Sequence, residues 1–331
     1  MRLWEAMVEL AFQVPVEQEL AQVDSRIREF FGPAHGLAAE VARHVLAMNG
    51  KRVRPTMLLL VARRDGRIPD RAVLGGAVVE LIHIATLIHD DSIDRSMLRR
   101  GLPTINSIYS DQVSIIMGDF VYSKAFALMA ERGLVREMGI LAETAHVMSR
   151  GEMRQLERKN RLDSTEADYL QVIDEKTASL FAAACSIGAI VRGATEAEVA
   201  AWDRFGREYG RAFQITDDLF DFIGEEALMG KARGSDIKSG RVTLPLIAAL
   251  GNASPRERSH ITDIILNDGM ADGLWSELVR FIDLQGGVDY CFARAAEHAR
   301  EAQTIAEDLD LDPDSRAALA AAVEHVVERR R

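Results

Sequence analysis

Apolar residues recur every three or four positions along most of this 331-residue chain, whereas alternating runs of β-branched residues are nearly absent. An α-helix turns once every 3.6 residues, so this spacing predicts helices almost throughout, about a dozen in all. The longest expected helices run from Asp70 to Ser92, Gln112 to Arg132, Thr165 to Arg192 and Glu196 to Ile223. Because the joining loops are short, residues 1–331 are predicted to form a single all-α domain, a large helical bundle.

Capping residues at several helix starts support this prediction. A serine, threonine or aspartate at the N-cap accepts a backbone hydrogen bond, and proline suits the first helical position. The candidate caps are Thr165 with Asp168, Thr195 with Glu198, Ser254 before Pro255, and Asp312 before Pro313.

Composition narrows the classes of protein that fit the chain. Hydrophobic residues make up 48% and charged residues 27%, which is enough apolar material for an extensive core. A formal net charge of −11 disfavours nucleic-acid binding, because phosphate backbones are bound by broad basic surfaces. Two cysteines, Cys185 and Cys291, are expected to be buried free thiols in a reducing compartment. The longest apolar runs, such as TMLLLVA, are short for a bilayer span, so a cytoplasmic protein is predicted.

Two matching acidic clusters each follow a strongly apolar turn. They contain Asp90, Asp91 and Asp94 in DDSID, and Asp217, Asp218 and Asp221 in DDLFD. Helical residues turn by about 100° each, so the three carboxylates of a cluster span an arc of roughly 100° and can point at one site. Mutual repulsion and the negative end of the helix dipole oppose folding of such a cluster unless a cation binds. One cluster alone would more often be a solvated surface, but two favour a magnesium, calcium or manganese site.

Basic segments lie beside these apolar helices. Arginine matches phosphate oxygens with a planar fork and lysine supplies a point charge, so diphosphate is a plausible common ligand. A single basic segment of this kind is more often part of the solvated surface than a binding site. The segments are NGKRVRP (49–55), RRG (99–101), EKT (175–177) and GKARGSD (230–236).

In this order, the motifs resemble those of the trans-isoprenyl diphosphate synthases, most closely the long-chain, octaprenyl-like members. The resemblance covers roughly residues 50–245, and both ends of the chain are less diagnostic. It is carried by GKRVRP at Gly50, ELIHIATLIHDDSIDRSMLRRGLPTIN at Glu80, GDF at Gly118, GEMRQL at Gly151, EKTASLF at Glu175, FQITDDLFD at Phe213 and GSDIKSGRVTLP at Gly234.

The resemblance implies the isoprenoid synthase type I fold and a prenyltransferase activity. Mg²⁺, up to three ions per site in the family, would help ionise an allylic diphosphate, either farnesyl or geranylgeranyl, and the double bond of isopentenyl diphosphate would attack the resulting cation. The proton would leave to the departing pyrophosphate. The implied product is an all-trans polyprenyl diphosphate of about forty carbons for quinone side chains, formed in a dry apolar cavity. A homodimer is also implied.

The resemblance also implies roles for individual residues, with metal ions at the two acidic clusters. The implied contacts to the allylic diphosphate are Arg99, Lys176 and Lys231. The implied contacts to isopentenyl diphosphate are Lys51, Arg54, His83 and Arg100. The candidate catalytic residues are Lys176, Thr177 and Gln214, of which the last two would lie near the reacting carbons.

Chain length is expected to depend on the residues beneath the first cluster. Thr86 is four residues before Asp90, about one turn deeper on nearly the same face, with Ala85 beside it. Both are small, where short-chain relatives usually carry an aromatic residue. Phe126 resembles the position of the tunnel floor in some octaprenyl-type members, although ordinary core packing explains it equally well.

One position departs from the family pattern. Arg241 stands where the family usually has lysine, so its charge is kept but its geometry is not. Arg241 is therefore a candidate diphosphate contact. The C-terminal ERRR is either a tail that closes over diphosphate or, more commonly, a solvated tail.

Several other interpretations stay open. A short-chain synthase would share the same motifs. An inactive partner subunit of a heteromeric synthase is another alternative, but such subunits typically lack intact metal motifs and this chain keeps both. A di-iron bundle would use the E-x-x-H spacing of Glu80 with His83 and Glu143 with His146. The HDD at His89 resembles all-helical metal phosphohydrolases, which would leave the second acidic cluster unexplained.

Overall fold

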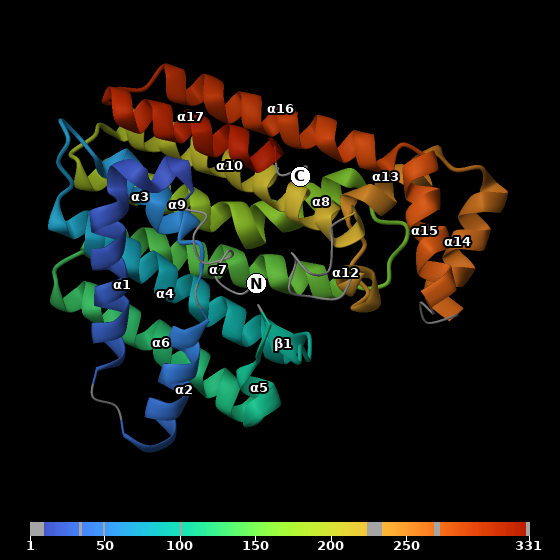
Figure 1. Ribbon diagram of the computed structural model, residues 1–331, viewed down its shortest axis with the longest axis horizontal. Helices are drawn as coiled ribbons and strands as arrows, with labels where there is room; N and C mark the ends of the chain where they lie inside the picture. Colours follow the sequence, from blue (N-terminus) through green and yellow to red (C-terminus); the bar gives the residue numbers. More distant parts are fainter. Residues whose placement is uncertain are drawn as a thin grey trace.

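The computed structural model describes residues 10–32, 35–48, 50–99, 101–223, 234–267 and 272–328. These residues are overwhelmingly helical, which confirms the predicted all-α class (Figure 1). The N-terminal half contains η1 (Ala11–Val16), α1 (Glu17–Phe31), α2 (Gly36–Ala47), α3 (Val53–Ala62), α4 (Asp70–Ile93), α5 (Ile105–Ile108), α6 (Asp111–Glu131) and α7 (Val135–Glu157). The C-terminal half contains α8 (Glu166–Ile173), η2 (Asp174–Ala178), α9 (Ser179–Val191), α10 (Glu196–Ile223), α12 (Ser235–Lys238), α13 (Leu244–Asn252), α14 (Pro255–Asn267), α15 (Asp272–Leu284), α16 (Gly287–Glu307) and α17 (Pro313–Glu328).

The predicted helix boundaries agree closely with the structure. Helices α4 and α6 each differ from the prediction by one residue at an end or at both, and α10 has the predicted bounds. The third long helix is divided, because the π-helical turn η2 interrupts it between α8 and α9. Among the predicted caps, Thr165 and Asp168 form a reciprocal capping box.

The centre of the bundle is α9, which is buried along nearly its whole length. A helix that is apolar on all sides needs neighbours on all sides, and α3, α4, α7 and α10 pack around it. A Cβ atom on Gly206 of α10 would lie 2.6 Å from the Cα atom of Ala182, so glycine is required for this close approach. Both cysteines are buried and free, as expected.

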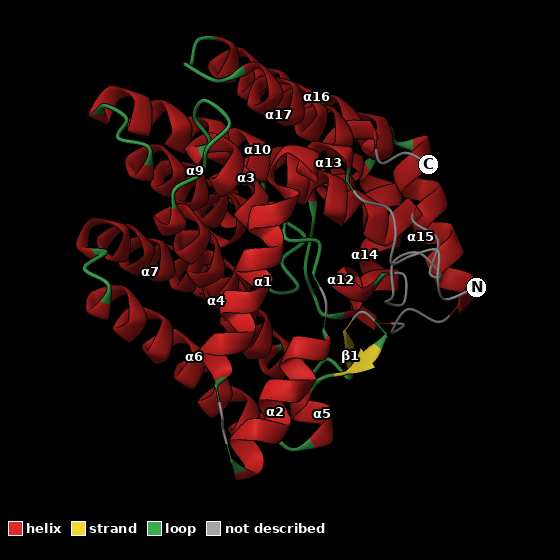
Figure 2. Ribbon diagram, turned by 60° about the vertical axis from the view of Figure 1, so that its left-hand side comes forward, coloured by secondary structure: helices red, strands yellow, loops and turns green. Residues whose placement is uncertain are grey.

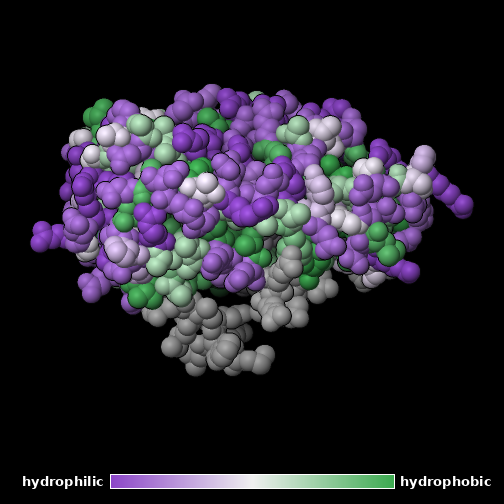
Figure 3. Space-filling model, turned by 90° about the horizontal axis from the view of Figure 1, so that it is seen from above, coloured by the Kyte–Doolittle hydropathy of each residue, from purple (hydrophilic) through white to green (hydrophobic). Residues whose placement is uncertain are grey.

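The helices form layers on either side of this core (Figures 1 and 2). On one side α16 packs along α10 and α17 lies beside α16, while α4 and α6 pack together on the other side. Helices α14 and α15 lie at one end of the molecule. The face in Figure 3 is largely hydrophilic with scattered apolar residues, as expected when most large apolar side chains are inside.

Among the residues that the structure describes, two helices are long and apolar enough to cross a membrane by length and composition alone. These helices are α4 and α6. In the most apolar 18-residue segment of each helix, 67% of the residues are buried inside the protein in α4 and 33% in α6. Burial in the bundle accounts for the apolar sequence of α4. Helix α6 instead carries exposed apolar side chains, including Ile115, Ile116 and Phe120. The cytoplasmic location stays a prediction.

Candidate active site

A large cavity opens where the C-terminal ends of α4 and α10 face each other. Its volume is about 3110 Å³, and its lining includes Asp90, Asp94, Asp217 and Asp218. Typical small-molecule pockets measure roughly 300–1,000 Å³, so this cavity has room for a ligand much longer than a metabolite. The fold therefore brings the two acidic clusters of the sequence to one site.

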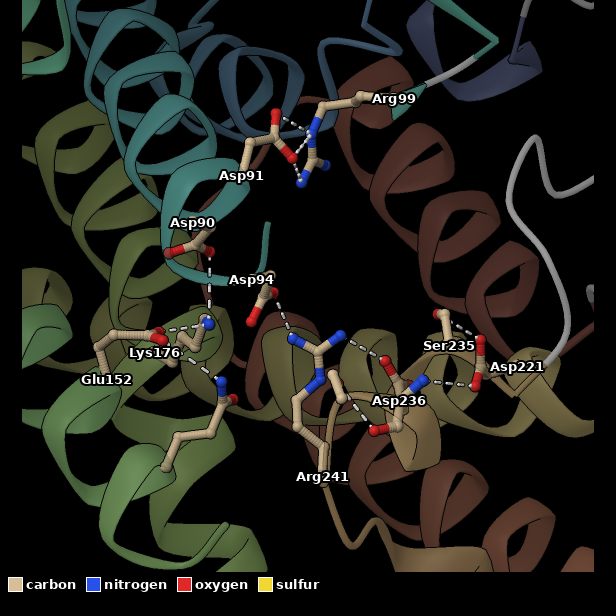
Figure 4. Close-up of polar contacts among 12 residues, drawn as sticks. Asp90, Asp91, Asp94, Arg99, Glu152, Lys176, Asp221, Ser235, Asp236 and Arg241 are labelled. Atoms are coloured by element: carbon tan, nitrogen blue, oxygen red, sulfur yellow. Dashed lines mark hydrogen bonds and ion pairs between the residues drawn. The ribbon is translucent and has the colours of Figure 1, made fainter. Parts of the chain in front are cut away.

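Two aspartates of the first cluster face the cavity, and each is met by a cation (Figure 4). The Nζ atom of Lys176 lies 3.3 Å from Oδ2 of Asp90, and the same ammonium group pairs with Glu152. The Nη1 atom of Arg241 lies 2.7 Å from Oδ2 of Asp94. Cations of the protein thus offset the repulsion expected within the cluster.

The third aspartate of this cluster, Asp91, does not point into the cavity. Its side chain is 5% exposed and accepts hydrogen bonds from Arg99, with 2.9 Å from Nε to Oδ2 and an Nη2 to Oδ1 distance of 2.8 Å. The hairpin of β1 (Leu98–Arg99) and β2 (Leu102–Pro103) turns Arg99 back toward the end of α4. Burial raises the pKa of Asp91, although the hydrogen bonds from Arg99 oppose this shift.

The second cluster is held by a chain of hydrogen bonds. The hydroxyl of Thr177 donates to Oε1 of Gln214 at 2.7 Å, and Nε2 of Gln214 donates to Oδ1 of Asp218 at 2.7 Å. The phenol of Tyr169 donates to Oδ2 of Asp218 at 2.8 Å. Burial, followed by the charge of Asp218, raises the pKa of Tyr169 well above its usual value, so the phenol stays a donor.

Asp221, the last acid of the second cluster, is buried and hydrogen-bonded within the protein instead of facing the cavity. It is fully buried and accepts hydrogen bonds from Oγ of Ser235 at 2.9 Å and from the backbone N–H of Asp236 at 3.0 Å (Figure 4). It thereby fixes the start of α12. The expectation that all three carboxylates of each cluster converge on one point is wrong in this geometry. Within the described ranges, no group of three or more acidic, histidine or cysteine side chains is arranged around one metal position.

Lys176 and Thr177 reach the cavity from the π-helical turn η2. Such turns commonly occur at functional sites, because they change the direction of side chains within a helix. Helix α7 passes close by, since a Cβ atom on Gly151 would lie 2.9 Å from the backbone nitrogen of Lys176. Burial alone would lower the pKa of Lys176, but Asp90 and Glu152 outweigh it and raise the pKa. Lys176 therefore remains an ammonium ion.

Residues predicted to bind the second diphosphate line another part of the same cavity. They are Lys51, Arg54 and His83. The Arg54 guanidinium lies 4.4 Å from the ring centroid of Phe181, a cation–π contact. The predicted contacts Arg100 and Lys231 lie outside the described residues, as do the arginines at 329–331.

Sequence reasoning missed Arg52, which organises this basic segment. Arg52 has a left-handed backbone with a φ of 52°. Its side chain pairs with Asp24 of α1 at 2.8 Å and with Glu80 of α4 at 2.7 Å. Glu80 is thus committed to an arginine rather than to iron. Glu143, from the other E-x-x-H pair, is exposed on α7, so these positions do not build a di-iron site.

Below Asp90 the cavity wall contains a threonine and a tyrosine. Thr86 and Tyr122 line the cavity, whereas Ala85 and Phe126 are not among its described lining residues. Phe126 stacks behind Tyr122 with ring centroids 6.4 Å apart. Burial and then the charge of Asp90 raise the pKa of Tyr122 to about 12. Tyr122, which the sequence analysis overlooked, therefore stands between the cavity and the residue expected at its floor.

Comparison with known proteins agrees with this geometry. The polyprenyl synthetase family model matches residues 35–282. The chain is 36% identical over 314 residues to the short chain isoprenyl diphosphate synthase of Methanothermobacter thermautotrophicus, covering 92% of this chain and 95% of that protein. It is 34% identical over 285 residues to the octaprenyl diphosphate synthase of Escherichia coli, covering 86% and 88%.

A solved structure extends the similarity to the fold. The polyprenyl synthase from Caulobacter crescentus, complexed with calcium and isoprenyl diphosphate, superposes with a TM-score of 0.91 at 33% identity. The match covers 97% of both chains.

Proposed function

Because the chain belongs to the polyprenyl synthetase family and is therefore a prenyltransferase, we propose that it condenses isopentenyl diphosphate with an allylic diphosphate to make a long-chain polyprenyl diphosphate. The observation that carries this proposal is the shared cavity, which two acidic helix ends and Lys176 face together. The same cavity suits long apolar chains by its volume. A phosphohydrolase would leave the second acidic cluster without a role.

The donor set fits a divalent ion such as Mg²⁺. Asp90, Asp94, Asp217 and Asp218 offer hard carboxylate oxygens, which Mg²⁺ prefers, and the cavity contains no cysteine among its described lining residues. These residues would hold the ions, up to three in number as the resemblance implies. When bound, Mg²⁺ supplies positive charge that stabilises the leaving diphosphate.

The chain's own cations hold the allylic diphosphate in this proposal. Lys176 and Arg99 both line the cavity near Asp90 and Asp94, and Lys231 is the third proposed contact. Lysine and arginine bind diphosphate oxygens with charge-assisted hydrogen bonds, which strengthen as negative charge develops on the leaving group. Arg99 binds the diphosphate in this proposal and also holds Asp91 through its hydrogen bonds.

Thr177 and Gln214 stabilise the carbocation. The Thr177 hydroxyl donates its hydrogen to Gln214, so its oxygen lone pairs remain available to face positive charge in the cavity. Oriented dipoles of this kind stabilise a developing charge without reorganisation during the reaction. The departing pyrophosphate takes the proton, so no protein nucleophile or base is required.

Isopentenyl diphosphate occupies the basic part of the cavity. Lys51, Arg54 and His83 bind its diphosphate, together with Arg100. The ion pairs of Arg52 with Asp24 and Glu80 hold this segment in place between α1 and α4. The two diphosphates therefore bind on separate groups of cations within one cavity.

The proposed product has about forty carbons, since small side chains beneath Asp90 leave room for chain growth in a dry cavity. Thr86 leaves the cavity open below the first cluster, and Tyr122 forms part of its wall. Relatives named for short-chain and for octaprenyl products share 36% and 34% sequence identity with this chain, so overall identity does not distinguish the two product lengths. The product length then depends on side-chain packing in the cavity. Use of the product for quinone side chains follows from the long-chain assignment.

We propose that the chain forms a homodimer in which α6 contributes to the interface. Ile116 is 68% exposed and Ile115 is 48% exposed, and Phe120 lies on the same helix. An apolar surface of this kind on a long helix suits a second copy of the chain. Light scattering should give twice the monomer mass for the wild type, and Ile116→Asp should yield the monomer.

Product analysis tests the proposed reaction. Purified protein is incubated with Mg²⁺, labelled isopentenyl diphosphate and either farnesyl or geranylgeranyl diphosphate, and the hydrolysed products are separated by chromatography. The expected result is a single long polyprenol. Products no longer than geranylgeraniol would favour the short-chain alternative, and inactivity of the purified chain alone would favour the partner-subunit alternative.

A further inference from the structure

Arg241 connects two walls of the cavity. Its Nη1 atom donates to Oδ2 of Asp94 at the end of α4 at 2.7 Å, and its Nη2 atom donates to Oδ1 of Asp236 in α12 at 2.8 Å (Figure 4). Asp236 in turn donates its backbone N–H to Asp221 of the second cluster. Hydrogen bonds through Arg241 thus connect the last aspartates of the two clusters.

The guanidinium donates to Asp94, one of the carboxylates that would hold a divalent ion in the proposed function. The side chains of Arg241 and Asp94 are 25% and 24% exposed, so the pair is shielded but can be reached from the cavity. Arg241 donates to Asp94 through one nitrogen, and its positive charge repels a divalent cation at the same carboxylate.

Arginine suits this double contact. Its planar fork reaches two carboxylates with separate nitrogens, whereas a lysine ammonium is a single point charge. The lysine that the family usually has at this position would hold Asp94 and Asp236 together less firmly.

We propose that Arg241 is a positioning residue that holds Asp94 against α12 and competes with a divalent ion for this carboxylate. This inference rests on the proposed metal-dependent function. Metal alone then binds weakly. Diphosphate offers the released guanidinium a new anionic partner, so metal and diphosphate bind cooperatively.

Manganese binding tests the proposal without any prenyl substrate. The affinity of the full chain for Mn²⁺ is measured by electron paramagnetic resonance, with and without inorganic pyrophosphate. Arg241→Gln should bind Mn²⁺ alone roughly two- to fivefold more tightly, as expected for loss of one partly exposed competing ion pair. The tightening of Mn²⁺ binding by pyrophosphate should be smaller than in the wild type. Arg241→Lys should give intermediate values.

Arg294→Gln is the matched control. Arg294 is 24% exposed and also connects two carboxylates, Glu166 and Glu297, but it does not line the cavity. This variant removes the same charge and should bind Mn²⁺ like the wild type. Circular dichroism melting checks that each variant is folded.

The possible failures are distinguishable. Equal Mn²⁺ affinity in the wild type and Arg241→Gln, or weaker binding in the variant, overturns the inference alone. Absence of Mn²⁺ binding from both proteins overturns the inference together with the proposed metal site. Failure of the wild type to elongate prenyl chains, with Mn²⁺ binding as expected, counts only against the proposed function.

Discussion

The phenol oxygen of Tyr169 lies 2.8 Å from Oδ2 of Asp218, so a residue of α8 orients an acid of α10 at the cavity. Gln214 holds the other oxygen of the same carboxylate. Two neutral donors from different helices thus help to set the direction of the Asp218 carboxylate at the cavity.

Removal of the Tyr169 hydroxyl should weaken both stability and activity. Tyr169→Phe leaves a buried carboxylate with one hydrogen bond fewer, which should lower the free energy of unfolding by about 1–2 kcal/mol. Prenyl transfer should slow, since Asp218 is less well oriented. Urea denaturation and initial rates measure these effects. Tyr290→Phe removes a hydroxyl that donates to Glu166 at the surface and should change little; an equal loss in both variants would contradict a specific role for Tyr169.

Removal of the Tyr122 ring should lengthen the product. Tyr122 lines the cavity and Phe126 packs behind it, so Tyr122→Ala should add about one to three isoprene units by opening a ring-sized space. Phe126→Ala should lengthen the product less. Chromatography of the polyprenols compares the two variants. Longer products from Phe126→Ala alone would place the floor of the cavity at Phe126. Unchanged product lengths in both variants would show that neither ring limits chain growth.

An aromatic residue at position 86 should have the opposite effect. Thr86 lines the cavity beneath Asp90, and its hydroxyl donates to the backbone of His83. Thr86→Phe fills this space and should stop elongation at farnesyl or geranylgeranyl length. Thr86→Ser serves as the control and should retain the wild-type product. A full-length product from Thr86→Phe would show that the chain grows along another path.

Neutralisation of cavity-facing aspartates should abolish activity. Asp90→Asn and Asp217→Asn should each reduce kcat/KM at least about a hundredfold, because metal-ion stabilisation contributes several kcal/mol. Excess chelator should have the same effect on the wild type, and added Mg²⁺ should restore the rate. Initial rates with labelled isopentenyl diphosphate measure the loss. Undiminished turnover in chelator would contradict the metal-dependent mechanism.

Glu208 should stabilise the fold in a pH-dependent manner. Burial alone would raise the pKa of Glu208, but His298 and Arg211 outweigh it and lower the pKa. A lowered folded-state pKa means that the stabilisation is present above the unfolded value of 4.5 and is lost as pH falls through the folded value.

Glu208→Gln tests this dependence. At pH 7 it should reduce the free energy of unfolding by about 1 kcal/mol, as for other partly buried ion pairs. The difference from the wild type should shrink as the pH falls below 4.5. Melting curves across the acidic range measure it, and a difference that stays constant with pH would assign the effect to packing.

The sequence by itself determined the helical class, the long helices and several caps. The bounds of α10 follow from periodicity and from a cap at its start, and the capping box of Thr165 and Asp168 forms within one turn. These features depend on neighbours within a few residues, so the local sequence contains the necessary information. The family resemblance, confirmed by the comparisons, came from motifs of the same kind.

The tertiary structure decided which side chains face the cavity. Helical spacing placed Asp90 and Asp91 on one arc, yet Asp91 turns to Arg99 while Asp90 meets Lys176. The ion pair of Arg241 with Asp94 likewise joins segments far apart in the chain. Side-chain direction depends on charges and donors that distant segments bring to the same place, and their arrival is a property of the packed bundle rather than of any local stretch.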